Sequence, residues 1–123
     1  MTRVSLALAA LLFAAPTIVA HADVAGNWRV EFVVPKGEMA VTMTINQHDD
    51  TLTGQVVNED GEFPLKGKVA GDAVTVTWTV PDSGQSLEIT MEGTIAGEYI
   101  NGVARLGSVG EGSLSARRVS RNP

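Results

Sequence analysis

The sequence contains no cysteine, and that absence removes several classes of protein. Disulfide bonds, thiolate catalysis and lipid attachment at an N-terminal cysteine are excluded, so a folded domain must be stabilised by apolar burial and backbone hydrogen bonds. Positive charge is also scarce, because 9 Lys and Arg stand against 14 Asp and Glu and give a net charge of −5. We therefore expect neither nucleic acid nor an anionic membrane surface to be the main partner.

Histidine is nearly absent as well. Only His21 and His48 occur, and His21 falls within the leader described below. A single remaining histidine cannot build a three-histidine metal site, and no nucleophile, base and orienting group are recognisable together. The stretches His48–Asp50 and Glu59–Glu62 could loosely hold a cation, but Asp and His are ordinary turn residues. We predict no enzyme, no catalytic residue, no metal site and no cofactor.

The one long apolar run lies at the N-terminus. Met1-Thr2-Arg3 precedes an apolar run from Leu6 to Ala20, and Ala20-His21-Ala22 then gives a small-x-small pattern. This order is typical of a secretory signal peptide, and the run is short for a membrane span. We predict a signal peptide over residues 1–22, a single β-barrel domain over residues 23–123, and a periplasmic or secreted protein. No membrane insertion of the mature chain is expected.

Beyond the leader no stretch has helical periodicity, whereas turn dipeptides recur roughly every 8–12 residues. The clearest segment is Leu65–Val80, in which two alternating runs flank Gly71-Asp72. A two-residue turn there predicts a β-hairpin. Its apolar face pairs Val69 with Val74, Gly67 with Val76, Leu65 with Trp78 and Phe63 with Val80.

The same inward phase persists at the other predicted turns. These turns lie at Pro35–Glu38, His48-Asp49, Asp60-Gly61, Pro81–Gly84, Gly97-Glu98 and Ser108–Gly110. The inward pairs that they predict include Trp28 with Ile45, Ile45 with Leu52, Val56 with Leu65, Trp78 with Leu87, Met91 with Ala104 and Ala104 with Leu114. Because a one-residue slip would exchange the two faces, this agreement predicts eight antiparallel strands in up-and-down order.

Eight sequential strands with one apolar face favour closure into a barrel, so the predicted fold is an all-β, eight-stranded antiparallel up-and-down β-barrel. The predicted interior contains Trp28, Phe32, Met43, Ile45, Leu65, Trp78, Ile89, Met91 and Leu114. The alternate positions are mostly Thr, Lys, Glu, Gln and Ser, which is the reverse of an outer-membrane barrel. We expect a soluble barrel whose interior holds side chains or one small ligand.

Four inward glycines have two interpretations. Gly54, Gly67, Gly93 and Gly102 could relieve crowding and let the strands coil sharply enough to close. Alternatively, they could leave a hollow for a ligand.

Two features resemble a known superfamily. Gly26-Asn27-Trp28 opens the first strand, and Arg118 ends the last strand pointing inward, where it can stack on the Trp28 ring. This pair resembles the Gly-x-Trp and C-terminal Arg of the calycins, which include lipocalins, fatty-acid-binding proteins and avidins, and Leu52-Thr53-Gly54 is similar to a segment of avidins. The resemblance implies a barrel with an apolar pocket. It transfers no binding residue, because the polar ring of avidins has no counterpart here.

The two ends of the predicted barrel differ. Bulky residues surround Trp28, whereas longer loops at Pro35–Glu38 and Pro81–Gly84 flank the other end, so any mouth is expected there. The predicted ligand-binding residues are Phe32, Val34, Met39, Asn58, Phe63, Trp78 and Leu87. Asn58 is the one inward polar side chain and would anchor a polar head group. We expect a non-enzymatic, exported binding module for a small, mainly apolar ligand. The alternative is a packed barrel that interacts with or inhibits an exported hydrolase or another protein.

Overall fold

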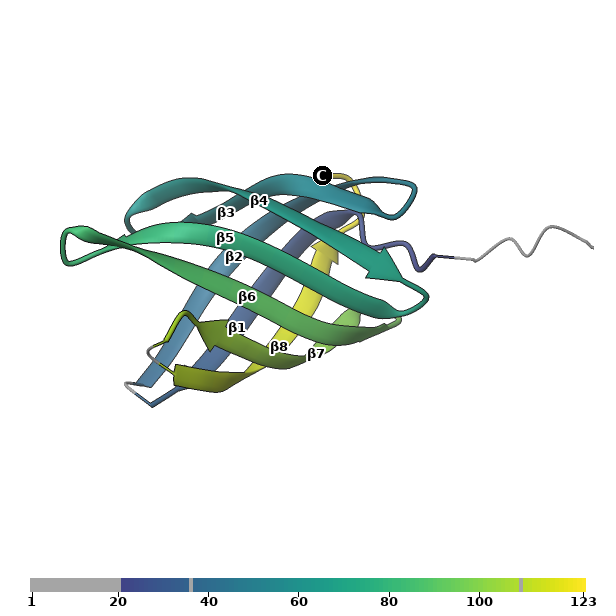
Figure 1. The fold of residues 1–123 in the computed structure, drawn as a ribbon. Coiled ribbons are helices and arrows are strands. Elements are labelled where there is room, and N and C mark those ends of the chain that lie inside the picture. Colours follow the sequence, from purple (N-terminus) through teal and green to yellow (C-terminus); the bar gives the residue numbers. More distant parts are fainter. Residues whose placement is uncertain (1–20, 36, 109) are drawn as a thin grey trace, which may run out of the picture.

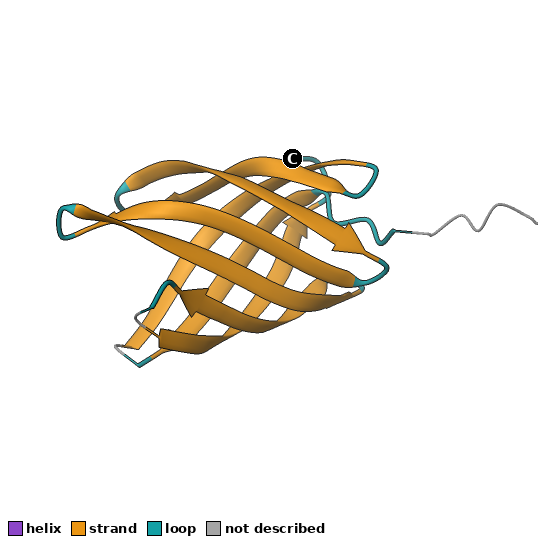
Figure 2. Ribbon diagram, in the orientation of Figure 1, coloured by secondary structure: helices purple, strands orange, loops and turns teal. Residues whose placement is uncertain are grey.

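The computed structural model describes residues 21–35, 37–108 and 110–123. Within this part of the chain Figure 2 shows strands and short connections and no helix. The strands are β1 (Gly26–Val34), β2 (Gly37–His48), β3 (Thr51–Asn58), β4 (Gly61–Ala70), β5 (Ala73–Asp82), β6 (Gln85–Ala96), β7 (Tyr99–Leu106) and β8 (Gly110–Ser120). The predicted signal peptide lies outside the described residues except for His21 and Ala22.

The strands form one closed barrel in sequence order. Each strand pairs antiparallel with the next, and β8 pairs with β1 to close the cylinder, with a register shift between Asn27 and Trp28. Figure 1 shows the strands running obliquely around the barrel, with the N-terminal segment and the C-terminus near the same end. The predicted all-β, eight-stranded up-and-down barrel is therefore confirmed.

The register matches the prediction at two turns. Gly71-Asp72 sets Leu65 opposite Trp78, and Gly97-Glu98 sets Met91 opposite Ala104. At both turns the glycine has a φ angle close to 60°, namely 60° at Gly71 and 61° at Gly97, and an acidic residue follows it. A two-residue hairpin loop of this kind has a twist that suits the adjoining strands, so the sequence specifies both the turn and the register.

At the other five turns the predicted register was wrong by two residues. The observed pairs are Trp28 with Met43, Ile45 with Gly54, Val56 with Phe63, Trp78 with Ile89 and Gly102 with Leu114. The β2–β3 and β3–β4 turns lie one residue away from their predicted positions, at Asp49-Asp50 and Glu59-Asp60, and the β5–β6 connection is shortened to Ser83-Gly84. Asp49 and Ser83 adopt φ angles of 55° and 50° in these turns. A shift of two residues keeps every side chain on its face, so the hydrophobic pattern could not detect it.

The predicted interior is correct despite these shifts. The nine side chains named above as the predicted interior are all buried, and they belong to one continuous apolar core. The core also takes in Val24, which precedes the first strand, and Val30, Val56, Val69 and Val76 from the walls. Outward positions of the same strands are mostly exposed. The alternation of side chains therefore determines what is inside.

The glycine row lets neighbouring strands approach one another closely. A Cβ atom placed on Gly54 would collide with the carbonyl oxygen of Thr44, and one on Gly102 would collide with that of Glu92. At Gly54 the φ angle of +145° adds strain for any other residue. The space beside these glycines is occupied by backbone, so they relieve crowding, and the interpretation as a hollow was wrong at these positions.

Candidate ligand pocket at the open end of the barrel

One end of the barrel is sealed around Trp28. The Trp28 ring is fully buried, and its indole nitrogen donates a hydrogen bond of 2.8 Å to the carbonyl oxygen of Val24. The guanidinium of Arg118 lies over the same ring, with its central carbon 4.8 Å from the ring centroid. Because β1 and β8 pair Trp28 with Arg118 directly, the predicted stacking of the two side chains is confirmed.

Backbone oxygens satisfy the buried Arg118. Its Nη1 donates to the carbonyls of Asp23 and Ala25 at 2.9 Å each, and its Nη2 donates to the carbonyl of Gly97 at 3.2 Å. Its Nε pairs with the Glu98 carboxylate at 3.2 Å. A buried charge with this many partners stabilises only the arrangement that supplies them, so Arg118 fixes the N-terminal segment and the β6–β7 turn at this end.

The N-terminal segment covers the same end. The Ala22 amide donates to the carbonyl of Gly71 at 2.9 Å, and Gln47 holds the segment from β2. Gln47 accepts from the Val24 amide at 2.7 Å and donates to the Ala22 carbonyl at 3.0 Å. The bond between Ala22 and Asp23, at which we predict cleavage, lies within this docked segment.

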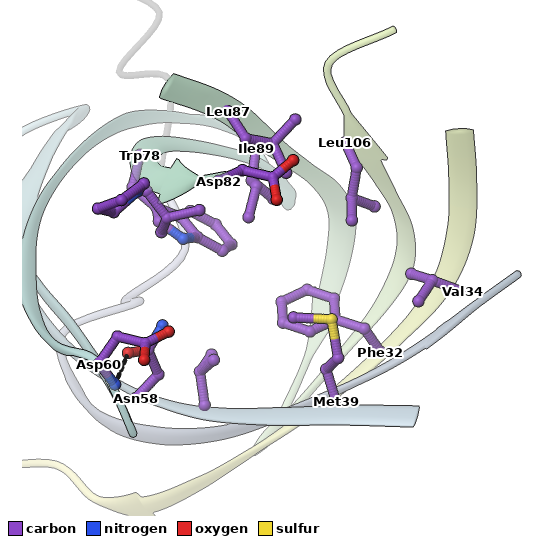
Figure 3. Close-up of a pocket in the computed structure, with 13 residues that line it drawn as sticks. Phe32, Val34, Met39, Asn58, Asp60, Trp78, Asp82, Leu87, Ile89 and Leu106 are labelled. Atoms are coloured by element: carbon purple, nitrogen blue, oxygen red, sulfur yellow. Dashed lines mark hydrogen bonds between the residues drawn. The ribbon is translucent and has the colours of Figure 1, made fainter. Parts of the chain in front are cut away.

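The other end contains an apolar pocket with a volume of about 230 Å³. Its lining comes mainly from the mouth-side halves of β1, β2, β5 and β6, and Figure 3 shows the side chains arranged around an open lumen. The lining residues are Phe32, Val34, Met39, Val41, Asn58, Asp60, Trp78, Val80, Pro81, Asp82, Leu87, Ile89 and Leu106. This is the end at which the sequence predicted a mouth.

The pocket brings together six of the predicted ligand-binding residues, namely Phe32, Val34, Met39, Asn58, Trp78 and Leu87. Phe63 is not among the lining residues. The expected pairing of Phe63 with Val80 is not formed, because β4 and β5 pair only as far as Leu65 and Trp78. Phe63 instead lies opposite Val56 and packs, half-buried, against the core.

Asn58 is less available as an anchor than the sequence suggested. Its side-chain oxygen accepts a hydrogen bond of 2.7 Å from the Asp60 amide and so stabilises the tight turn between β3 and β4. The amide nitrogen of the side chain makes no hydrogen bond to the described residues and remains able to donate to a ligand.

Two acidic residues line the pocket beside the apolar groups. From the sequence, Asp60 was interpreted as a turn residue within Glu59–Glu62, and Asp82 was assigned to the Pro81–Gly84 loop. In the structure β5 continues through Asp82, which pairs with Gln85. Asp82 therefore keeps the inward phase of Trp78 and Val80. Extending that alternation past the assumed strand end would have found it.

The Trp78 ring forms part of the pocket wall with Phe32, and the two ring centroids are 6.0 Å apart at an angle of 40°. Trp78 is only 2% exposed, yet among the described residues its indole nitrogen has no hydrogen-bond partner. No fully buried side-chain nitrogen or oxygen in the described part of the chain lacks a partner. It follows that the Trp78 N–H is reached from the lumen, as a free donor in an apolar wall.

Comparisons with known proteins add no functional assignment. No protein-family model matches the chain, and no curated protein is significantly similar to it. The eight-stranded antiparallel barrel is compatible with a calycin-like fold. Over residues 21–35, 37–108 and 110–123, no helix is long and apolar enough to cross a membrane. The same residues contain no group of three or more His, Asp or Glu side chains placed to hold a metal ion.

Proposed function

We propose that this protein is an exported, non-enzymatic binding module, calycin-like in architecture, that takes a small and mainly apolar ligand in the pocket between Phe32 and Trp78. The observation that carries the proposal is the cavity of about 230 Å³ inside an otherwise filled barrel. Protein interiors are close-packed, so a hollow of this size in a small domain calls for an explanation.

The size and lining of the pocket limit the ligand. An engineered apolar cavity of about 150 Å³ binds benzene, so a volume of about 230 Å³ suits an aromatic ring with a short substituent. The wall offers aromatic and aliphatic side chains and few polar atoms, which is the usual composition of a small-molecule site. A long lipid chain would not fit within the described walls.

Titration with 2-phenylethanol, followed by calorimetry, tests the proposal. We expect saturable binding of one molecule per chain. Leu87→Trp should abolish it, because the half-buried Leu87 lies in the lining and a larger side chain would occupy the lumen. Tyr99→Trp is the matched control, because Tyr99 is 54% exposed on the outer wall and the substitution adds an indole outside the barrel. Binding that is absent in the wild type, or unchanged in Leu87→Trp, would overturn the proposal.

The N-terminal sequence supports export. Residues 1–22 have the order of a signal peptide, and the predicted mature chain begins at Asp23. The intact mass of the protein recovered from a periplasmic or secreted fraction should correspond to residues 23–123. A mass that includes the leader would contradict this part of the proposal.

A further inference from the structure

The rim of the pocket carries negative charge, and a purely apolar ligand would make no ionic contact with it. Asp60 and Asp82 both line the pocket, one in the β3–β4 turn and one at the end of β5. Figure 3 shows their carboxylates on different sides of the opening, with the lumen between them. Both residues are exposed, and within the described part of the chain neither takes part in an ion pair.

No basic residue is found among the described lining residues. Glu59 in the β3–β4 turn and Glu62 at the start of β4 add negative charge at the same end. Arg105, which precedes the lining residue Leu106 on β7, is paired with Glu92 at 2.8 Å on the outer wall. The described charged groups that line the opening are therefore carboxylates, which attract cations and repel anions.

The wall below the rim offers two further features. Phe32 and Trp78 present aromatic rings to the lumen, and aromatic faces attract cations as well as apolar groups. The indole N–H of the largely buried Trp78 is open to the lumen and has no partner among the described residues, so it can donate a hydrogen bond to an acceptor on the ligand. The acidic groups at the mouth and the hydrogen-bond donor in the wall would thus bind different parts of one ligand.

We propose that the pocket binds an organic amine. The ammonium group lies at the opening between Asp60 and Asp82, the apolar body packs against Phe32 and Trp78, and an acceptor on that body takes the Trp78 N–H. The inference rests on the proposed function, since it concerns the same pocket. It specifies in addition that the ligand is positively charged, so carboxylates such as fatty acids are not preferred ligands.

Three phenols of nearly equal size test the charge preference: 2-(4-hydroxyphenyl)ethylamine, 2-(4-hydroxyphenyl)ethanol and 4-hydroxyphenylacetate. We expect the amine to bind about tenfold more tightly than the alcohol, as partly screened ion pairs allow, and the carboxylate to bind more weakly than the alcohol. High salt should reduce the advantage of the amine and leave the alcohol unchanged. Calorimetry and ligand-observed NMR measure these affinities without interference from phenol absorption.

Variants assign the preference to the rim. The double variant Asp60→Asn and Asp82→Asn should lower the affinity for the amine to that for the alcohol. Asp49→Asn and Asp72→Asn, in turns at the sealed end, provide the matched control and should change nothing. Trp78→Phe should weaken the phenolic amine by a larger factor than 2-phenylethylamine, which lacks the acceptor.

The possible outcomes distinguish the preference for an amine from the proposed binding of a small apolar ligand. If the alcohol binds and the amine binds no better, the charge preference is wrong and the apolar pocket stands. If the amine is preferred but the double variant keeps that preference, the assignment to Asp60 and Asp82 is wrong. If none of the three phenols and no 2-phenylethanol binds, both the proposed function and the inference fail.

Discussion

The barrel contains one tryptophan in its sealed half and one in its open half, and the surroundings of the two rings differ. The Trp28 indole donates to the Val24 carbonyl and lies beneath the guanidinium of Arg118. Trp78 contacts Phe32 at the edge of a cavity, and in the described part of the chain its N–H has no partner. The same residue type therefore completes a closed structure at one end and is left with an unused donor at the other.

The difference comes from what covers each end. At the sealed end, the segment before β1 crosses the lumen and supplies the carbonyls of Asp23 and Ala25 to Arg118. At the open end the described connections are short hairpin turns, as at Glu59-Asp60 and Ser83-Gly84. Figure 1 shows these turns at the end away from the N-terminal segment. A two-residue turn can join adjacent strands but cannot cover the lumen between opposite walls.

The largest effect is expected from removing the seal. Arg118→Ala should lower the free energy of unfolding by about 4 kcal/mol, because it leaves the Glu98 carboxylate and several backbone carbonyls without their buried partner. For a domain of this size the melting temperature would fall by more than about 15 °C. Thermal unfolding followed by circular dichroism measures the change.

Arg117→Ala is the control, since Arg117 is the neighbouring residue on β8 and points outward. It should change the stability by no more than about 0.5 kcal/mol. Equal melting temperatures for the two variants would show that the contacts of Arg118 contribute nothing to the difference between the ends.

A second comparison uses two methionines on the same strand, β2. Met43 is fully buried opposite Trp28, whereas Met39 is 43% exposed opposite Phe32 at the pocket. Met43→Ala should destabilise the protein by about 3 kcal/mol, because it creates a cavity in a packed region. Met39→Ala should cost about 0.5 kcal/mol, because its side chain borders a space that is already hollow. Urea unfolding measures both, and similar losses would mean that the two halves are equally packed.

The sequence predicted which side chains lie inside but not how far each strand slides along its neighbour. The alternation from Trp28 to Arg118 has a period of two residues, and each turn had to preserve it, so the buried set followed from parity alone. Ile45 opposite Gly54 and Ile45 opposite Leu52 are equally consistent with that parity. Only the observed turn geometry, such as the left-handed backbone of Asp49, distinguishes them.

The candidate site was predictable to the same extent. Phe32, Val34, Met39, Trp78 and Leu87 were placed correctly at the pocket because they share the inward phase at one end. Phe63 was misplaced because β4 and β5 stop pairing beyond Leu65 and Trp78, and Asp82 was missed because β5 is longer than expected. The partners of Arg118 include carbonyl groups, which every residue carries, so no side-chain pattern in the sequence could identify them.

Moderate stability effects, and the most direct comparison of the ends, come from replacing each tryptophan in turn. Trp28→Phe should cost about 2 kcal/mol, because it removes the hydrogen bond to Val24 and the ring beneath Arg118. Trp78→Phe should cost about 1 kcal/mol, because no hydrogen bond to the described residues is lost and the adjoining space is already open.

The same two variants also locate the ligand, because each leaves a single tryptophan as a fluorescent reporter. On addition of 2-phenylethanol, the emission of Trp78 in Trp28→Phe should shift or change in intensity, since that ring lines the pocket. The emission of Trp28 in Trp78→Phe should stay constant, since its ring is sealed behind Val24 and Arg118. A response from Trp28 alone would place the ligand at the wrong end of the barrel and reverse the roles assigned to the two tryptophans.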